Sequence, residues 1–167
     1  RQRAQILAEN PTKWGHPGVI VTNAYGADFA RLEGCFDVVA TDVPCSGEGM
    51  FRKDEGAVSQ WSPGLVEQCV RTGWEIVNDV WPALRTGGYL VYSTCTFNRE
   101  ENGDNVWRTC RELGAEPVPV ETDTAWQIGG DTPGRGLPVY HFFPHRTQAE
   151  GLFPALHRRS AAVPYST

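Results

Sequence analysis

The strongest constraint on the fold is a strand–helix–strand pattern in the middle of the chain. The run Phe36–Asp42 has the near-continuous hydrophobicity of a strand buried on both faces. A long helix is predicted next, because Ser62 suits an N-cap, Pro63 suits a first turn, and apolar residues recur at helical spacing up to Gly87-Gly88. Residues 89–93 predict a second strand. Two strands joined through a helix pair in parallel, so the pattern predicts an α/β sheet.

The flanking segments extend this pattern. Residues 1–14 predict a helix that ends at Gly15, and residues 19–22 predict a short β-branched strand. Asn98 and Glu101 have capping-box spacing, which predicts a helix to about Leu113. Residues 118–120 predict a weak strand, residues 126–138 a loop, and residues 139–143 and 151–156 a closing antiparallel hairpin. We expect a mostly parallel sheet with this antiparallel hairpin, in one domain over residues 1–159, and a disordered tail over residues 160–167.

Composition narrows the class of protein. No apolar stretch is long enough to cross a bilayer, and the first residues do not resemble a signal peptide. The five cysteines are odd in number and lack C-x-x-C spacing, which argues against a disulfide framework and a metal site and favours the reducing cytoplasm. The net charge of −5 does not indicate general nucleic-acid binding. A basic site must be local, either at Arg52 and Lys53 or among the late residues His141, His145, Arg146, Arg158 and Arg159.

Two cysteine-bearing strings follow the two central strands. The first is DVPCSGEGMFRK at residues 42–53, and the second is STCTFN at residues 93–98. The carboxyl ends of strands are where open α/β sheets bind and transform ligands, so Cys45 and Cys95 are expected to face one substrate. Such a pair suits covalent chemistry on a pyrimidine base turned out of its stack. Cytosine C5 becomes nucleophilic enough to accept a methyl group once a thiolate adds to C6.

These strings resemble motifs IV and VI of the RNA cytosine-5 methyltransferases of the RsmB/RsmF and Nop2/Sun type. Residues 44–53, 61–63, 92–98 and 99–102 fit the RsmF-like branch, and residues 142–145 and 150–153 resemble its closing hairpin. The resemblance covers nearly the whole chain. It implies a Rossmann-like class I methyltransferase sheet, S-adenosylmethionine as methyl donor, and RNA, in particular ribosomal RNA, as substrate.

The resemblance also implies roles for individual residues. Cys95 matches the nucleophile, Cys45 matches the cysteine that helps release the methylated product, and Asp42 matches the aspartate that contacts both cofactor and base. Lys53 stands where a basic residue could neutralise RNA, although a solvated loop charge is an equal alternative. Asp42 could alternatively be only a turn residue at the end of its strand. Trp61 is a candidate for lining an RNA channel, whereas Cys35, Cys69 and Cys110 are expected to be packing residues.

The chain departs from the family pattern in its first part. No glycine-rich cofactor loop precedes residue 36, and Gly47 and Gly49 belong to the first cysteine string. Residues 23–28 stand where relatives often place an acid against adenine, and either Asn23 or Asp28 could take that place. The N-terminal strands of the family sheet are absent, which would leave the strand over residues 36–42 with an exposed edge. We therefore expect either a fragment of a longer enzyme or a second chain that completes the sheet.

Two other functions fit parts of the pattern. A catalytically silent RNA-binding or assembly module would account for the absent cofactor loop. A DNA cytosine-5 methyltransferase also uses a Pro-Cys cysteine, but it would give the Thr-Cys string no purpose. The leading expectation is therefore methylation of cytosine C5 in RNA through a covalent cysteine–C6 adduct.

Overall fold

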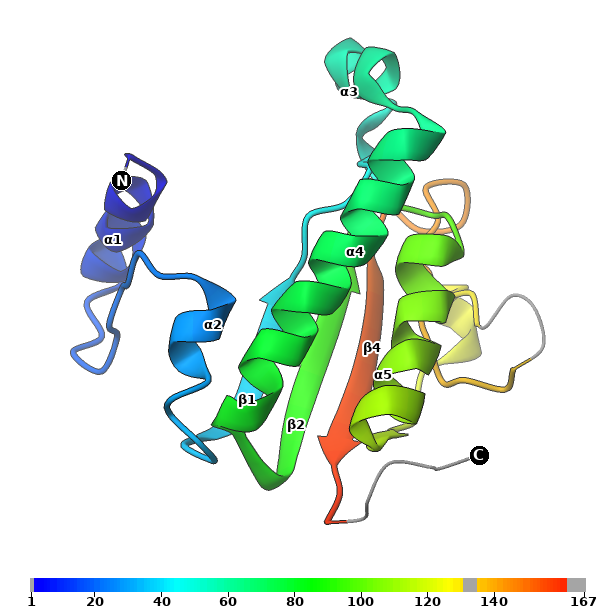
Figure 1. Cartoon of the computed structure of the whole chain (residues 1–167). Helices are drawn as coiled ribbons and strands as arrows, with labels where there is room; N and C mark the ends of the chain where they lie inside the picture. Colours follow the sequence, from blue (N-terminus) through cyan, green and yellow to red (C-terminus); the bar gives the residue numbers. More distant parts are fainter. Residues whose placement is uncertain (1, 131–134, 162–167) are drawn as a thin grey trace.

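The computed structural model describes residues 2–130 and 135–161, so residues 162–167 of the expected tail lie outside the described residues. Its helices and strands follow one another in the order α1 (Gln2–Trp14), α2 (Gly26–Phe29), β1 (Phe36–Asp42), α3 (Glu55–Gln60), α4 (Pro63–Val80), β2 (Leu84–Thr94), α5 (Asn105–Leu113), β3 (Ala115–Pro117) and β4 (Phe153–Arg159). The expected strand–helix–strand unit is present as β1, α4 and β2 (Figure 1).

The described strands form one mixed sheet in the order β1-β2-β4-β3. Strand β1 pairs with β2 in parallel, whereas β4 runs antiparallel to both β2 and β3. The prediction of a mostly parallel sheet is therefore wrong for the described residues. The reason is that parallel neighbours need a crossover helix, and α4 supplies the crossover only between β1 and β2.

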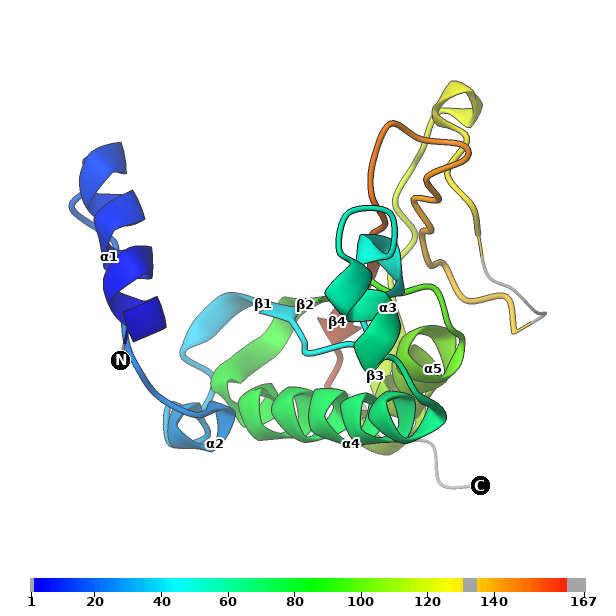
Figure 2. The ribbon, with the colours of Figure 1, turned by 90° about the horizontal axis from the view of Figure 1, so that it is seen from above.

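Helices α4 and α5 lie side by side on one face of the sheet (Figure 2). Helix α4 begins as predicted, because the Ser62 side chain accepts a hydrogen bond from Leu65 N at 3.1 Å and Pro63 follows it. It ends at Val80, earlier than expected, since Pro82 cannot continue a helix and β2 already begins at Leu84. Gly87 and Gly88 therefore lie inside β2. The core between helices and sheet contains the buried residues Val77, Leu84, Leu90, Tyr92, Val106 and Phe153.

The region around residues 139–156 only partly forms the expected hairpin. Isolated antiparallel bridges join Val139 to Ala155 and Phe142 to Leu152, as the hairpin requires. The regular strand, however, is β4, which extends beyond residue 156 and pairs with β2 along its length. The predicted strand over residues 118–120 is also displaced, because β3 is Ala115–Pro117.

The first part of the chain lacks the strand expected at residues 19–22. That segment has no regular structure, and Ile20 is 88% exposed. Helix α1 lies apart from the sheet in both views (Figures 1 and 2). A strand needs a hydrogen-bonded neighbour, and the described residues place none beside this segment.

Among the described strands, β1 is at the edge of the sheet and pairs only with β2. It is not buried on both faces, because Val38 is 56% exposed and only the α4 side of the strand is covered. None of the described helices is both long and apolar enough to cross a membrane.

Candidate active site

The parallel pairing of β1 and β2 brings the two cysteine strings together. Asp42 lies opposite Ser93 in the register, and Val43 N donates to Ser93 O at 3.1 Å just beyond it. The loops continue in contact, because Gly49 N donates to Cys95 O at 2.9 Å. This approach requires glycine, since a Cβ at residue 49 would lie 2.5 Å from Cys95 O.

The two thiols of these loops touch. The Sγ atoms of Cys45 and Cys95 are 3.2 Å apart, and Cys95 N lies 3.4 Å from the Cys45 sulfur. The hydrogen bond from the Cys45 thiol lowers the pKa of Cys95 to about 7, against the opposing effects of burial and of the Asp42 charge. The same hydrogen bond, reinforced by burial, raises the pKa of Cys45. Cys95 is therefore the thiolate of the pair and the better nucleophile at neutral pH.

Asp42 stands at the carboxyl end of β1, beside this pair. Its side chain is exposed, and Ser93 Oγ lies 3.3 Å from its Oδ1 atom. Ser93 Oγ also lies 3.1 Å from Thr41 O, so the hydroxyl bridges the two strand ends. Asp42, Cys45 and Cys95 thus lie together at the carboxyl ends of β1 and β2, as the sequence predicts.

A carboxylate in the first loop holds the second loop. Glu48 Oε2 accepts hydrogen bonds from Phe97 N and Asn98 N, each at 2.8 Å. Its other oxygen accepts from Trp61 Nε1 at 3.1 Å and from Asn98 Nδ2 at 3.3 Å. Burial raises the pKa of Glu48, but the hydrogen bonds outweigh burial and hold the pKa below its usual value.

A carboxylate in the helical turn that follows the second loop holds the first loop in return. Glu101 is buried, and its Oε2 atom accepts from Ser46 N at 2.8 Å while its Oε1 atom accepts from Asn98 Nδ2 at 2.6 Å. The predicted capping box is half formed. Asn98 Oδ1 accepts from Glu101 N at 2.9 Å, but the backbone N–H of Asn98 donates to Glu48 and not to Glu101. A single π-helical turn, Glu100–Asp104, then leads into α5.

Sequence reasoning missed the roles of Glu48 and Glu101. The signal that could have found Glu48 is a carboxylate three residues after the Pro-Cys cysteine, in a loop expected to pack on a helix start. The sequence predicts only a capping-box role for Glu101, because short sequence spacing reveals local bonds and not the bond to Ser46, 55 residues away.

The remaining candidates lie in other surroundings. Lys53 pairs with Glu150 and lines a polar pocket with Arg52, Thr147 and Gln148. Trp61 is tied to Glu48. Asp28 accepts a hydrogen bond from Tyr25 N at 2.9 Å and so caps its own short helix, α2. Cys69 and Cys110 are buried packing residues as expected, whereas Cys35 is exposed, so its expected packing role is wrong.

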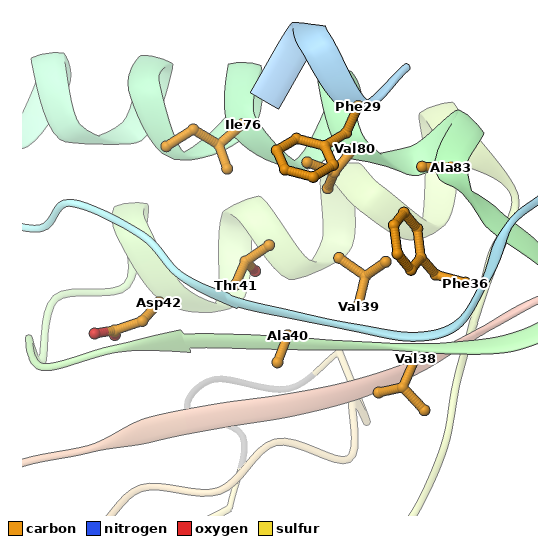
Figure 3. A pocket seen from close by; sticks show the side chains of 10 residues that line it. All are labelled: Phe29, Phe36, Val38, Val39, Ala40, Thr41, Asp42, Ile76, Val80 and Ala83. Atoms are coloured by element: carbon orange, nitrogen blue, oxygen red, sulfur yellow. The ribbon is translucent and has the colours of Figure 1, made fainter. Parts of the chain in front are cut away.

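A groove of about 360 Å³ runs along β1 to Asp42, and neither Cys45 nor Cys95 lines it. Figure 3 shows Phe29, Val80 and Ile76 forming its far wall and Asp42 at one end. Its lining is mainly apolar. The groove therefore lies along the open edge of β1, whereas the thiols and the carboxylates that bind the loops lie beyond the end of the strand.

Comparisons with known proteins bear on this arrangement. The family described as "16S rRNA methyltransferase RsmB/F" matches residues 1–158. The chain is 37% identical over 163 residues to ribosomal RNA small subunit methyltransferase F of Erwinia tasmaniensis, and 36% identical over 168 residues to that of Escherichia coli. In both cases it aligns over 97% of its own length and spans about a third (34%) of the relative.

Solved structures give the same result. The crystal structure of NSun6 from Pyrococcus horikoshii with SFG, an analogue of S-adenosylmethionine, matches 97% of this chain and 40% of that one, with a TM-score of 0.80 and 26% identity. A methyltransferase homolog protein from Pyrococcus horikoshii matches in fold, with a TM-score of 0.77 over 95% of this chain and 50% of that one, at 20% identity. With the family match extending over residues 1–158, the chain belongs to the RsmB/F family of 16S ribosomal RNA methyltransferases.

Proposed function

We propose that this chain carries the substrate side of an S-adenosylmethionine-dependent methyltransferase that modifies cytosine C5 in ribosomal RNA. The observation that carries the proposal is the contact between the Cys45 and Cys95 sulfur atoms, 3.2 Å apart at adjoining strand ends. A single thiol would suffice for nucleophilic attack. A second thiol in contact with it fits a reaction in which the covalent adduct must also be resolved.

Cys95 acts as the nucleophile in this proposal. Its thiolate adds to C6 of the target cytosine, and the electron pair displaced from the C5–C6 double bond makes C5 nucleophilic. C5 accepts the methyl group that S-adenosylmethionine would supply. A water molecule then takes the C5 proton, the C5–H electron pair re-forms the double bond, and the C6–sulfur bond breaks with its electron pair returning to Cys95 as the thiolate. The pKa of about 7 keeps a substantial fraction of Cys95 ionised at neutral pH.

Cys45 and Asp42 act around this step. Cys45 holds its proton because its pKa is raised, so it donates a hydrogen bond to the Cys95 sulfur and helps release the methylated product. Asp42, oriented by Ser93, faces the base and the cofactor from the end of β1. Lys53 is proposed to contact the RNA backbone, in competition with its partner Glu150.

The described residues fit only one side of a cofactor site. Asp42 and the apolar wall of the groove along β1 could contact S-adenosylmethionine, which supplies the methyl group when bound. The sequence before β1 holds no glycine-rich loop for the rest of the cofactor. We propose that further polypeptide pairs with the open edge of β1 and supplies that loop, in the cytoplasm, where both thiols stay reduced.

The test is methyl transfer from labelled S-adenosylmethionine to ribosomal RNA, by this chain and by any longer protein that contains it. Cys95→Ala is expected to abolish both transfer and the covalent RNA adduct, because no other thiolate lies at C6. Cys45→Ala is expected to retain the adduct and slow its release. Full transfer by Cys95→Ala would overturn the assignment of the nucleophile.

A silent RNA-binding or assembly module is the second candidate. Two measurements distinguish this module from the enzyme: titration calorimetry of S-adenosylmethionine into this chain, and RNA affinity with and without S-adenosylmethionine. RNA affinity that is independent of S-adenosylmethionine in every form that contains the chain supports the module. A cofactor-dependent rise in RNA affinity supports the enzyme.

A further inference from the structure

We propose that Glu48 and Glu101 form a reciprocal carboxylate clamp that positions Cys45 against Cys95. The clamp consists of these two carboxylates and the backbone amides that they bind, at Phe97 and Asn98 for Glu48 and at Ser46 for Glu101. Each carboxylate follows one cysteine in the chain and binds backbone beside the other. Both are therefore positioning residues, and their importance for catalysis rests on the proposed function.

The Glu48 half of the clamp holds the segment that follows Cys95. Phe97 N and Asn98 N are two and three residues beyond Cys95, and one carboxylate oxygen accepts from both. Because a charged acceptor makes stronger hydrogen bonds than a neutral one, this oxygen fixes where the second loop turns away from β2. Glu48 is three residues beyond Cys45, so it acts at short range on both cysteines.

The Glu101 half holds the segment that follows Cys45. Its carboxylate binds the backbone of Ser46, the next residue, and Glu101 is only 1% exposed. The backbone of Glu101 is itself fixed, because Tyr92 OH donates to Glu101 O at 2.6 Å from the core strand β2. Through Glu101, the backbone next to Cys45 is therefore anchored to strand β2 of the sheet.

Asn98 joins the two halves. Its Nδ2 group lies 3.3 Å from Glu48 Oε1 and 2.6 Å from Glu101 Oε1, so one amide separates two carboxylates that would otherwise repel. Ser46 Oγ and Thr96 Oγ1 add a direct contact of 2.9 Å between the loops. These polar bonds converge on residues that directly follow the two cysteines, namely Ser46, Thr96, Phe97 and Asn98. This convergence distinguishes the clamp from ordinary loop packing.

The clamp is tested by the rate at which the two thiols can be cross-linked in this chain. The oxidant diamide removes two electrons and two protons from the pair as the S–S bond forms, and the sulfur atoms must close from 3.2 Å to about 2.05 Å. Glu48→Gln keeps the side-chain shape, but it presents either an NH₂ group or an uncharged oxygen, which is a weaker acceptor, to the backbone amides of Phe97 and Asn98. We expect cross-linking to slow by about tenfold or more.

Glu55→Gln is the matched control, since Glu55 is an exposed carboxylate in the neighbouring helix α3. It should cross-link at the wild-type rate. Thermal unfolding of both variants establishes that each is folded at the assay temperature. An unchanged cross-linking rate in folded Glu48→Gln overturns the proposal.

A second measurement needs no substitution. In the wild-type chain, the amide resonances of Phe97 and Asn98 should shift together as the Glu48 carboxylate titrates, with a midpoint below the ordinary range of glutamate because its pKa is lowered. The amide of Val66, in α4, bonds to Ser62 O in a turn capped by a serine and should not follow that titration. Phe97 and Asn98 amides that keep their shifts over the pH range in which the Glu48 side-chain carboxyl carbon itself titrates overturn the clamp, even if Glu48→Gln fails to fold.

The effect of the clamp on catalysis is measured in a form of the protein that transfers methyl groups. Glu48→Gln is expected to lower kcat, with KM for RNA unchanged, and to accumulate covalent RNA adduct as Cys45→Ala does. A loss of fold alone would not trap the adduct. If wild-type protein transfers no methyl group in any form, the proposed function fails, while the cross-linking result still decides whether the clamp exists.

Discussion

The sulfur atoms of Cys45 and Cys95 lie 3.2 Å apart although 50 residues separate them in the chain. Their contact follows from the parallel register of β1 and β2, in which Asp42 lies opposite Ser93. Each cysteine comes a few residues beyond that pair, in loops joined by the hydrogen bond from Gly49 N to Cys95 O. The geometry therefore depends on the register of two strands and on the loop bonds just beyond them.

Removal of one thiol should change the acidity of the other. In Cys45→Ala the pKa of Cys95 should rise from about 7 toward its ordinary value, because the thiol hydrogen bond that lowers it is lost. Alkylation of Cys95 by iodoacetamide at pH 7 should slow by about tenfold, as measured by peptide mass spectrometry across a pH series. Cys35→Ala removes an exposed thiol and should leave the Cys95 profile unchanged. If the pH profile of Cys95 alkylation is the same in Cys45→Ala and wild type, the hydrogen bond from Cys45 does not lower the pKa of Cys95.

Gly49→Ala should separate the loops. The added methyl group would lie 2.5 Å from Cys95 O and 3.3 Å from Glu150 O, both backbone atoms that cannot rotate away. We expect a loss of about 1–3 kcal/mol in the free energy of unfolding, measured by urea denaturation, together with slower cross-linking of the thiols. Gly130→Ala, where the new methyl group meets no atom within 4 Å, should be nearly neutral.

The elements that the sequence predicted well are those whose signal is local. The cap at Ser62 and the apolar stripe of α4 depend on neighbours along one helix, and both are present. The meeting of Asp42, Cys45 and Cys95 was also predictable, because it needs only a parallel pair of strands. The strand at residues 19–22 was not, since a strand exists only beside a partner, and sequence hydrophobicity does not say whether the partner is there.

The polar network around the thiols was beyond sequence reasoning for a related reason. Glu101 and Asn98 have a spacing that suggests a mutual bond within one helix turn, and part of that bond forms. The competing partners Ser46 and Glu48 come from a loop that reaches this helix only through the sheet. Local motifs identify a donor and an acceptor, but tertiary structure decides which ones meet.

Lys53 should contribute to RNA binding in a salt-dependent way. If it displaces Glu150 to contact a phosphate, Lys53→Ala should reduce the slope of log affinity against log salt by about 0.7, the value for one phosphate on single-stranded RNA. Fluorescence anisotropy with a labelled oligonucleotide, over a salt series, measures that slope. Lys13→Ala, in α1, is the control. An unchanged slope in Lys53→Ala would leave the lysine as the ion-pair partner of Glu150 alone.

The open edge of β1 should promote self-association of this chain. Val38 is 56% exposed on that strand, and unpaired edges with apolar side chains pair readily with other chains. Val38→Lys should lower the average mass measured by light scattering at high protein concentration, because charge on an edge opposes strand addition. Val58→Lys places the same charge at a valine that is 51% exposed in α3, and should leave the mass as in wild type.

Acid should destabilise the fold through His157. This residue lies on β4 opposite Leu90, is fully buried, and neither ring nitrogen makes a hydrogen bond of normal geometry. Burial lowers its pKa to about 4, and the nearby backbone of Leu90 and Val106 offsets only part of that effect. Since an unfolded histidine titrates near pH 6.5, the unfolded state takes up its proton first as the pH falls.

The stabilising contribution of neutral His157 is therefore complete above about pH 6.5 and is lost as the pH falls toward 4. Between pH 7.5 and 4.5 the free energy of unfolding should fall by about 2–3 kcal/mol from this residue, as measured by urea denaturation at each pH. His157→Phe should remove that part of the pH dependence, because phenylalanine fills the site without titrating. His145→Gln, at an exposed position, should retain it. Equal pH dependence in wild type and His157→Phe would show that the acid sensitivity of the fold has another source.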